Sequence, residues 1–172
     1  CRTIAFTYSE PTVFYEYMYD TFKLAKKNNI KTVLVTNGFI NEKPLRDLLP
    51  YLDAANVDLK SFTDGFYREV ADAWAEPILN TLKTISKSKT WLEITNLIIP
   101  TLNDDLKEIK KMCEWINENL GSDIPLHFSA FYPCYKLMDL PPTSEKVLIK
   151  ARDIAKKAGL KYVYMGNVRA ED

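Results

Sequence analysis

Glycine, an excess of basic residues and long apolar runs are all lacking in this chain of 172 residues. Its five glycines form neither a G-x-x-x-x-G-K nor a G-x-G-x-x-G phosphate-binding loop. Lys plus Arg number 23 and Asp plus Glu number 23, so the net charge is zero, whereas nucleic-acid binders usually carry a basic excess. Apolar stretches such as residues 97–99 fall far short of the roughly 20 residues of a membrane helix. We therefore expect neither a nucleic acid nor a membrane as a partner.

Cysteine is also rare. Cys1, Cys113 and Cys134 have neither the spacing of a C-x-x-C metal site nor that of a dense disulfide framework. This usage favours a reducing, cytoplasmic setting. The chain starts at Cys1 with no signal segment, and we expect it to be an internal piece of a longer protein.

Strand-like and helix-like patterns alternate along the chain, and its length predicts a single domain over residues 1–172. Hydrophobic residues make up 47% and charged residues 27%, as in globular domains. We expect strands at residues 2–7, 31–36, 54–60, 91–99, 126–131 and 162–165. We expect helices at residues 12–28, 41–52, 64–86, 104–120 and 144–158. Pro77 should kink the 64–86 helix or split it in two.

This alternation predicts an α/β fold with parallel strands joined by right-handed crossovers. About six strands with outer helices are too few for a closed (β/α) barrel, which needs eight strands and typically about 250 residues. An open doubly wound sheet is the alternative. We expect a partial, TIM-like (β/α) barrel.

Three successive strands break the apolar pattern of a buried parallel strand. Each places two polar side chains on one face: Asp58 and Lys60, Glu93 and Thr95, His127 and Ser129. Charges inside a barrel cost on the order of several kcal/mol unless they are paired, solvated or bound by a ligand. They could form a salt-bridged set at the wet rim of the sheet. We favour a polar ligand pocket at the carboxyl ends of the strands.

The first three strands also end in polar residues. Pro11 favours an extended backbone at Glu10, which would direct the carboxylate off the strand end; a helix start is the alternative. The second strand ends in Thr36-Asn37-Gly38, and the helical pattern that follows favours a βα turn over a hairpin. The third ends in Asp58-Leu59-Lys60.

Several segments together resemble one family. They are residues 4–12 (IAFTYSEPT), 35–38 (VTNG), 57–62 (VDLKSF), 97–104 (LIIPTLND), 127–129 (HFS), 140–143 (LPPT) and 162–168 (YVYMGNV). The chain is similar to radical S-adenosylmethionine (SAM) enzymes of the pyruvate formate-lyase activating-enzyme type. The most similar branch is the AmmeMemoRadiSam system radical SAM protein, and the resemblance spans nearly the whole chain.

The resemblance implies that the chain binds SAM. Ser9-Glu10-Pro11 corresponds to the family's G-G-E-P-like motif, which holds the methionyl amino group through an anionic side chain and backbone carbonyls. Thr36 and Asn37 lie where activating enzymes contact the methionine end of SAM. Lys60 matches a lysine that pairs with the SAM carboxylate, and Asp58 matches an acid that holds the ribose hydroxyls. SAM is a zwitterion, so its ammonium and carboxylate groups would pair with side chains of the opposite charge.

Two further residues are candidates for the same cavity. Thr95 has the right depth in its strand to line it. His127 either lines it or is a hydrogen-bonded core histidine.

The family's C-x-x-x-C-x-x-C segment, which holds a 4Fe–4S cluster, would precede Cys1 and is missing, and the three cysteines present cannot replace it. Relatives also usually continue beyond the last residues of this chain. Tyr132 stands where the family often has histidine, and Val35 replaces an acid of the activating enzymes proper.

The resemblance therefore implies a parent enzyme that reduces SAM at the cluster, giving methionine and a 5′-deoxyadenosyl radical. That radical would abstract hydrogen from a protein or a small molecule. We expect the fragment itself to be inactive.

Two other functions fit some of these residues. A Schiff-base lyase of the aldolase type would use Lys60, with Asp58 beside it. A non-catalytic binding or assembly module would use the unpaired edge of the strand at residues 2–7, through which we expect dimerisation.

Overall fold

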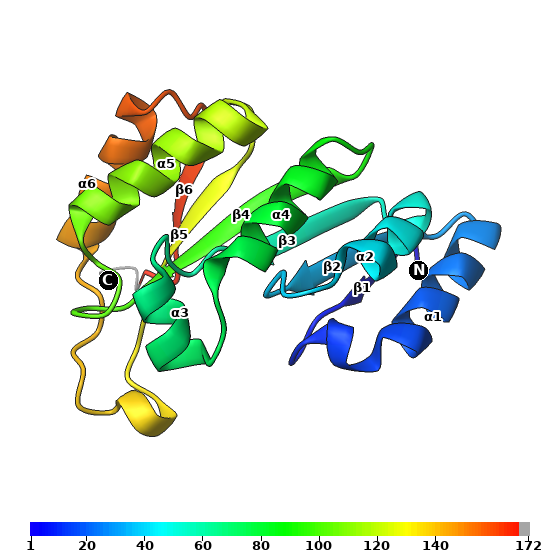
Figure 1. Ribbon diagram of the computed structural model, residues 1–172, viewed down its shortest axis with the longest axis horizontal. Coiled ribbons are helices and arrows are strands. Elements are labelled where there is room, and N and C mark those ends of the chain that lie inside the picture. The colour runs from blue at the N-terminus through cyan, green and yellow to red at the C-terminus, as the bar shows by residue number, and fades with distance from the viewer. Residues whose placement is uncertain (169–172) are drawn as a thin grey trace. The chain divides into compact units, whose positions relative to one another are not determined.

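The computed structural model describes residues 1–168, in which strands and helices alternate along the chain (Figure 1). The strands are β1 (Thr3–Phe6), β2 (Lys31–Thr36), β3 (Ala54–Asp58), β4 (Trp91–Ile98), β5 (Leu126–Ala130) and β6 (Val163–Gly166). The α-helices are α1 (Tyr15–Lys27), α2 (Glu42–Leu48), α3 (Asp64–Ala71), α4 (Ala75–Ser86), α5 (Leu106–Leu120) and α6 (Glu145–Lys157). Short 3-10 helices are η1 (Pro11–Phe14), η2 (Leu49–Tyr51) and η3 (Tyr135–Leu137).

The strands of the described residues form one sheet in chain order, β1-β2-β3-β4-β5-β6. The pairs β1–β2, β2–β3, β4–β5 and β5–β6 are parallel. The register places Leu34 beside Ala55, and Thr95 beside His127. The predicted α/β class with six parallel strands and connecting helices is confirmed. No helix within residues 1–168 is long and apolar enough to cross a bilayer.

The third strand is shorter than expected. We expected it to reach residue 60, but β3 ends at Asp58. Leu59 still donates its N–H to the Thr95 carbonyl (2.9 Å). The N–H of Lys60 instead donates to the Tyr67 hydroxyl (3.1 Å), so the chain leaves the sheet at this residue.

The helix expected at residues 64–86 is divided in two, but not at Pro77. The break follows Asp72, whose left-handed backbone (φ 48°, ψ 45°) ends α3. The carboxylate of Asp64 accepts a hydrogen bond from the N–H of Ala75 (3.0 Å) at the start of α4. Pro77 lies in the first turn of α4, where the N–H that proline lacks has no helical partner to lose.

The chain divides into two compact units. The first comprises residues 1–58 and 76–93, and the second comprises residues 59–75 and those from Ile94 onward. Each unit is therefore built from two separate stretches of sequence. The expectation of a single domain over residues 1–172 stays a prediction.

The first unit packs its helices against one face of its strands. Met18, Phe22 and Ala25 follow a helical spacing along α1 and are buried, as are Leu34 of β2 and Val57 of β3. Burial of such apolar side chains is the main source of stability of the unit.

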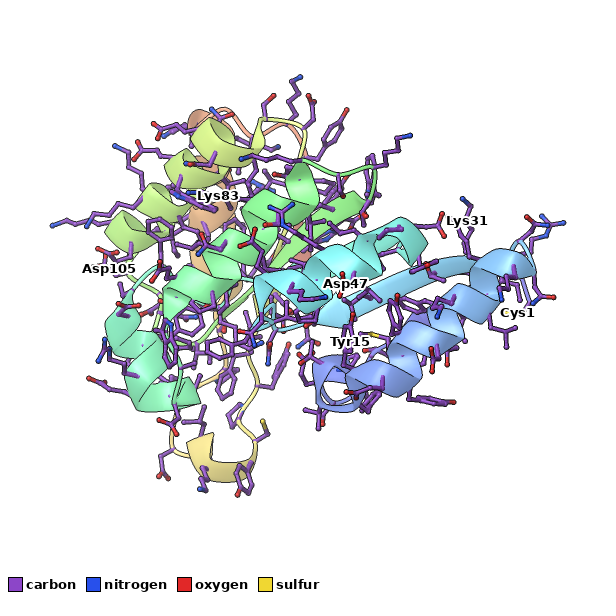
Figure 2. All side chains as sticks on the ribbon, turned by 45° about the vertical axis from the view of Figure 1, so that its right-hand side comes forward. Cys1, Tyr15, Lys31, Asp47, Lys83 and Asp105 are labelled. Carbon is purple, nitrogen blue, oxygen red and sulfur yellow. The ribbon has the colours of Figure 1, made fainter. Side chains whose placement is uncertain are left out.

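A hydrogen bond joins two helices of the first unit. The hydroxyl of Tyr15 in α1 donates to the carbonyl of Pro44 in α2 (2.8 Å). Burial, followed by the nearby carboxylate of Asp47, raises the pKa of Tyr15 to about 12. Tyr15 and Asp47 are labelled in Figure 2. The hydroxyl therefore stays protonated, and remains a donor, at neutral pH.

The second unit has its own core. Helices α5 and α6 lie side by side (Figure 1) and bury apolar faces, including Ile116 on α5 and Leu148 on α6. Beneath them, β5 alternates strictly between buried and half-buried residues. The buried residues of β5 are Leu126, Phe128 and Ala130.

The predicted division of faces in β3, β4 and β5 is confirmed. The apolar members expected opposite the polar pairs are at most 3% exposed: Val57, Leu59, Leu92, Ile94, Leu126, Phe128 and Ala130. The polar members are half-buried: Asp58, Lys60, Glu93, Thr95, His127 and Ser129. The half-buried face therefore carries the residues that could meet a polar ligand.

Asp53 anchors the amino ends of two strands in the first unit. Its carboxylate accepts from the ammonium groups of Lys31 (2.7 Å) and Lys26 (3.3 Å), and from the N–H of Thr32 (3.0 Å). Burial by itself would raise the pKa of Asp53, but the hydrogen bonds from Lys31, Thr32 and Lys26 outweigh it and lower the pKa from 3.8 to about 2.

Asp53→Asn should therefore lower the free energy of unfolding by about 2 kcal/mol at pH 7. A carboxyl with a depressed pKa contributes stability above its unfolded value of 3.8, and this is lost as the pH falls toward 2. Urea unfolding at pH 7, 4 and 3 should show a shallower acid decline for the variant. Asp123→Asn, which breaks an exposed pair with Lys161, is the control and should have little effect. Parallel acid declines for Asp53→Asn and the unchanged chain would contradict this account.

Candidate functional site

The carboxylate of Glu10 connects the segment after β1 with the end of β2, both in the first unit. Its Oε1 accepts from the hydroxyl of Thr36 (2.7 Å) and from the N–H of Thr12 (3.1 Å). Its Oε2 accepts from the N–H of Asn37 (2.7 Å). The backbone of Glu10 is extended (φ −140°, ψ 109°), as expected before Pro11. The alternative is also partly right, because the same side chain caps η1.

Thr36, Asn37 and Gly38 form the expected βα turn. The hydroxyl of Thr36 accepts from the N–H of Gly38 (3.1 Å), and Oδ1 of Asn37 accepts from the N–H of Phe39 (2.8 Å). Gly38 has φ +75°, and a Cβ built there would lie 2.8 Å from Cγ1 of Val57. The turn therefore needs glycine for both its backbone angle and its space.

The cluster of Glu10, Thr36 and Asn37 suits a cationic ligand. A carboxylate offers about four acceptor sites, and three hydrogen bonds to Glu10 have been described. Within residues 1–168, this leaves about one acceptor site for an ammonium group. Ser9 is exposed next to this cluster, and Pro11 is buried as the first residue of η1.

In the second unit, the backbone of Lys60 is held by three side chains. Its carbonyl accepts from the amides of Asn103 (2.6 Å) and Asn96 (3.1 Å). Its N–H donates to the hydroxyl of Tyr67 (3.1 Å). Sequence reasoning missed these partners. The available signals were that Asn103 lies in a family-like segment and that Asn96 interrupts the apolar face of its strand.

The other expected site residues occupy the half-buried strand faces. Asp58 ends β3 in the first unit. In the second unit, Thr95 and His127 are neighbours across β4 and β5. The imidazole of His127 stacks on the ring of Tyr164 in β6, with centroids 5.1 Å apart. Whether His127 lines a ligand site or is a hydrogen-bonded core histidine stays a prediction.

Further side chains cap strand ends in the second unit. The hydroxyl of Thr143 donates to the carbonyl of Ile98 in β4 and accepts from the N–H of Phe131 (2.9 Å) after β5. The amide of Asn167 donates to the carbonyl of Ala130 (2.7 Å). Thr143 and Asn167 both belong to family-like segments, and their hydrogen bonds give these segments a structural role.

The described residues do not fit a 4Fe–4S cluster. Within residues 1–168, no group of three or more His, Cys, Asp or Glu could hold a metal ion. Cys1 and Cys134 are exposed, whereas Cys113 is buried in α5. Burial, with a smaller contribution from Glu114, raises the pKa of Cys113 to about 12, so it is a protonated thiol and not a thiolate ligand.

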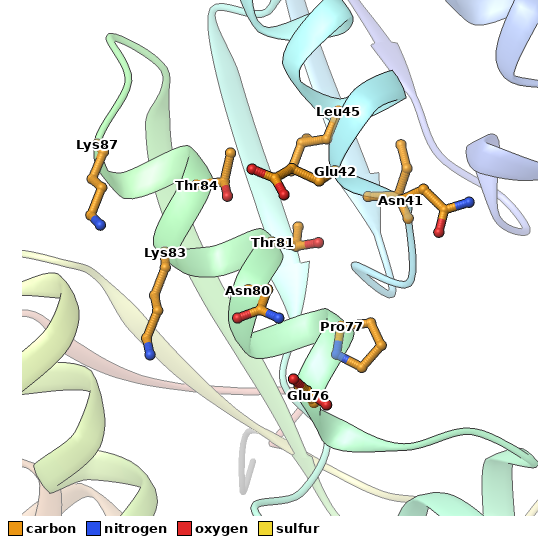
Figure 3. Close-up of a pocket in the computed structure, with 11 residues that line it drawn as sticks. Asn41, Glu42, Leu45, Glu76, Pro77, Asn80, Thr81, Lys83, Thr84 and Lys87 are labelled. Atoms are coloured by element: carbon orange, nitrogen blue, oxygen red, sulfur yellow. The ribbon is translucent and has the colours of Figure 1, made fainter.

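A hollow of about 460 Å³ lies elsewhere in the first unit, between α2 and α4 (Figure 3). Figure 3 shows Glu42 on one side and Asn80 and Thr81 on the other. Glu42 already forms an ion pair with Arg46 (2.7 Å). None of the site residues expected from the sequence lines this hollow, so it is distinct from the strand-end site.

Thr36→Val should lower the free energy of unfolding by about 1–3 kcal/mol, because the half-buried carboxylate of Glu10 and the buried N–H of Gly38 lose their hydrogen bonds to the hydroxyl. Thr36 is 3% exposed, so water does not readily replace that group. Thr36→Ser keeps the hydroxyl and should lose less. Urea denaturation measures both variants, and a loss in Thr36→Ser with none in Thr36→Val would show that the methyl group, not the hydrogen bond, stabilises the turn.

Comparisons with known proteins find a matching family model and several similar proteins. Residues 1–116 match the family model described as the radical SAM superfamily. The chain is 47% identical over 168 residues to the uncharacterized protein MJ0808 of Methanocaldococcus jannaschii, covering 98% of this chain and 50% of that protein. It is 24% identical over 152 residues to the (2S)-3-sulfopropanediol dehydratase activating enzyme of Klebsiella oxytoca, covering 86% of this chain and 48% of that protein. The chain thus spans about half the length of these relatives.

A solved structure shares the fold. It is a domain of pyruvate-formate lyase-activating enzyme from Bacteroides vulgatus, with a TM-score of 0.82 and 20% sequence identity, over 95% of this chain and 98% of that one. This likeness confirms the predicted fold class, a partial TIM-like (β/α) barrel. The family model matches residues 1–116, and the similarity to MJ0808 covers almost all of this chain. The chain therefore belongs to the radical SAM superfamily.

Proposed function

We propose that this chain is the SAM-binding core of a radical SAM enzyme related to the activating enzymes. The observation that carries the proposal is the hydrogen-bonded cluster of Glu10, Thr36 and Asn37, which follows the first two strands. It leaves an anionic acceptor at the position where the family resemblance puts the methionyl amino group.

In the first unit, Glu10 would accept a hydrogen bond from the ammonium of SAM, with backbone carbonyls near Ser9 and Pro11 as further acceptors. Thr36 and the N–H of Asn37 hold the carboxylate of Glu10 in place, so its orientation is fixed before the ligand arrives. Asp58, half-buried at the end of β3, would accept from the ribose hydroxyls.

In the second unit, Lys60 would pair with the carboxylate of SAM. Such charge-assisted hydrogen bonds are about twice as strong as neutral ones. Thr95 and His127, on the half-buried face of β4 and β5, would line the ligand cavity.

SAM bound in this way would supply a sulfonium carbon–sulfur bond that reductive cleavage at a 4Fe–4S cluster converts to methionine and a 5′-deoxyadenosyl radical. The described residues do not fit that cluster. We therefore propose that the chain by itself binds SAM but does not cleave it. The residues named above would orient the ligand and shield it from water.

The substrate of the whole protein would be a protein or a small molecule. Support comes from relatives named as activating enzymes, such as that of (2S)-3-sulfopropanediol dehydratase. The enzyme would be an oxidoreductase of the cytoplasm, a setting that agrees with cysteines that are all free within residues 1–168.

Glu10→Gln should weaken SAM binding to this chain at least tenfold, because it removes a charge-assisted hydrogen bond of roughly 1.5–3 kcal/mol. Equilibrium dialysis with labelled SAM measures the affinity. Glu16→Gln, which changes an exposed carboxylate of α1 in the same unit, is the matched control and should bind like the unchanged chain.

Thr36→Val separates the two roles of the cluster, since it removes a hydrogen bond to Glu10 but keeps the charge. It should weaken binding less than Glu10→Gln does. Equal affinity of Glu10→Gln and the unchanged chain would refute the proposed role of Glu10.

We also propose that this chain dimerises through the edge of β1. That strand is the terminal one of the sheet within residues 1–168, and Thr3 and Ala5 on it are exposed. An uncovered strand edge is a template for pairing with another chain.

Sedimentation analysis of the chain should therefore show a dimer. Introducing lysines at both exposed positions, Thr3→Lys and Ala5→Lys, should restore a monomer, since charge on an edge strand opposes pairing. Lysines at two exposed, neutral sites on α4 and α5, Asn80→Lys and Asn119→Lys, add the same charge and are the control. A monomer of the unchanged chain at high concentration would rule the interface out.

A further inference from the structure

The segment at residues 97–104 has no direct role in the function proposed above, although it is among the family-like stretches. Its Asn103 lies after β4, in a tight loop where the N–H groups of Leu102 and Asn103 donate to the carbonyl of Ile99 (both 3.2 Å). Asn103 itself reaches back to the segment after β3. What it contacts there is the backbone of Lys60.

We infer that Asn103, assisted by Asn96, is a positioning residue that fixes the backbone of Lys60 and thereby aims its ammonium at the carboxylate of SAM. The inference rests on the proposed role of Lys60 as the partner of that carboxylate.

Lys60 needs such support because it lies beyond the sheet. β3 ends at Asp58, and the last hydrogen bond of the strand pairing joins the N–H of Leu59 to the carbonyl of Thr95. A long, flexible side chain on an unsupported residue would spread its ammonium over many positions. The conformational entropy lost on binding would then weaken the ion pair.

The hydrogen-bonding groups of the Asn103 amide are all used. Its Nδ2 donates to the carbonyls of Lys60 (2.6 Å) and Leu97 (2.8 Å), and its Oδ1 accepts from the N–H of Ile99 (2.6 Å). An amide has two N–H donors and an acceptor in one plane, so it can bridge two carbonyls and one N–H. A carboxylate at this position would face two carbonyl oxygens without a proton to share.

Asn96 adds a second support from within β4. It is 2% exposed, and its Nδ2 donates to the carbonyls of Leu59 (2.7 Å) and Lys60 (3.1 Å). Its Oδ1 is buried and has no hydrogen-bond partner among residues 1–168. Asn96 and Asn103 both line a small cavity of about 50 Å³, which has room for a water molecule.

Tyr67 of α3 completes the support by binding the N–H of Lys60. Its hydroxyl accepts from the N–H of Lys60 (3.1 Å), and the residue is 2% exposed. Both backbone groups of Lys60 are thus bonded to side chains of the same unit. These side chains come from α3, β4 and the loop after β4.

The test compares two ligands that differ only in the group that Lys60 would bind. They are SAM and decarboxylated SAM, which lacks the carboxylate. Equilibrium dialysis against this chain, without iron or sulfide, gives the ratio of the two dissociation constants. The unchanged chain should bind SAM at least tenfold more tightly than decarboxylated SAM, and Lys60→Met should bring the ratio close to one.

Asn103→Ala should lower the ratio as Lys60→Met does, while its affinity for decarboxylated SAM stays within twofold of the unchanged chain. A general loss of structure would instead weaken both ligands equally. Tyr67→Phe, which removes only a hydroxyl, should lower the ratio at least threefold and serves if Asn103→Ala does not fold. The matched control is Asn117→Ala, which removes an amide bonded to the carbonyl of Ala158 (2.9 Å) in the same unit and should keep the full ratio.

The outcomes separate the two proposals. If the unchanged chain binds both ligands equally or binds neither, or if Lys60→Met keeps the ratio, the proposed role of Lys60 is wrong. If Lys60→Met lowers the ratio but folded Asn103→Ala and Tyr67→Phe both keep it, the positioning inference alone is overturned.

Discussion

Backbone groups at the end of a parallel strand lose their partners in the sheet, and the structure of this chain depends on how side chains replace them. An unpaired polar group away from water costs on the order of 1–3 kcal/mol. Glu10 serves the end of β2 by accepting from the N–H of Asn37. After β3, the amide of Asn103 donates to the backbone carbonyl of the segment. Thr143 and Asn167 donate to backbone carbonyls at the ends of β4 and β5. The family-like segments therefore include structural residues as well as candidates for ligand binding.

Two kinds of polar residue therefore lie near the strand ends of each unit. Asn103 and Thr143 direct their polar groups into the backbone. Lys60 and Asp58 are half-buried side chains that remain candidates for ligand contacts. Glu10 belongs to both kinds, since it caps η1, holds the turn after β2 and keeps acceptor capacity. A substitution there changes folding and binding together, which is why Glu10→Gln is compared with Thr36→Val, a variant that keeps the carboxylate.

Much of the fold could be predicted from the sequence because the relevant signals are local. The two-residue period of β5 assigned Phe128 to the buried face, and Pro11 fixed the extended backbone of Glu10. The break after Asp72 was missed because it depends on a left-handed residue and on a contact between Asp64 and Ala75, eleven positions apart. No helical periodicity contains that information.

The site was predicted less completely for a similar reason. The charges of Glu10 and Lys60 were evident from the strand-end patterns, but the support of Lys60 by Asn103 joins residues 43 positions apart. Only the folded chain brings them together. The pairing of Glu10 with Thr36, 26 positions away, likewise required the structure, although both residues had been singled out separately.

The hydrogen bonds of Thr143 have a consequence for the loop that precedes it. The N–H of Thr143 donates to the carbonyl of Phe131 (3.0 Å), and its hydroxyl accepts from the N–H of Phe131. These two hydrogen bonds join the ends of the loop between the two residues. The loop includes η3, whose Tyr135 is 84% exposed. Changing the length of a surface loop with fixed ends costs little free energy. Insertions and exchanges at residues 132–142 should therefore leave β5 undisturbed.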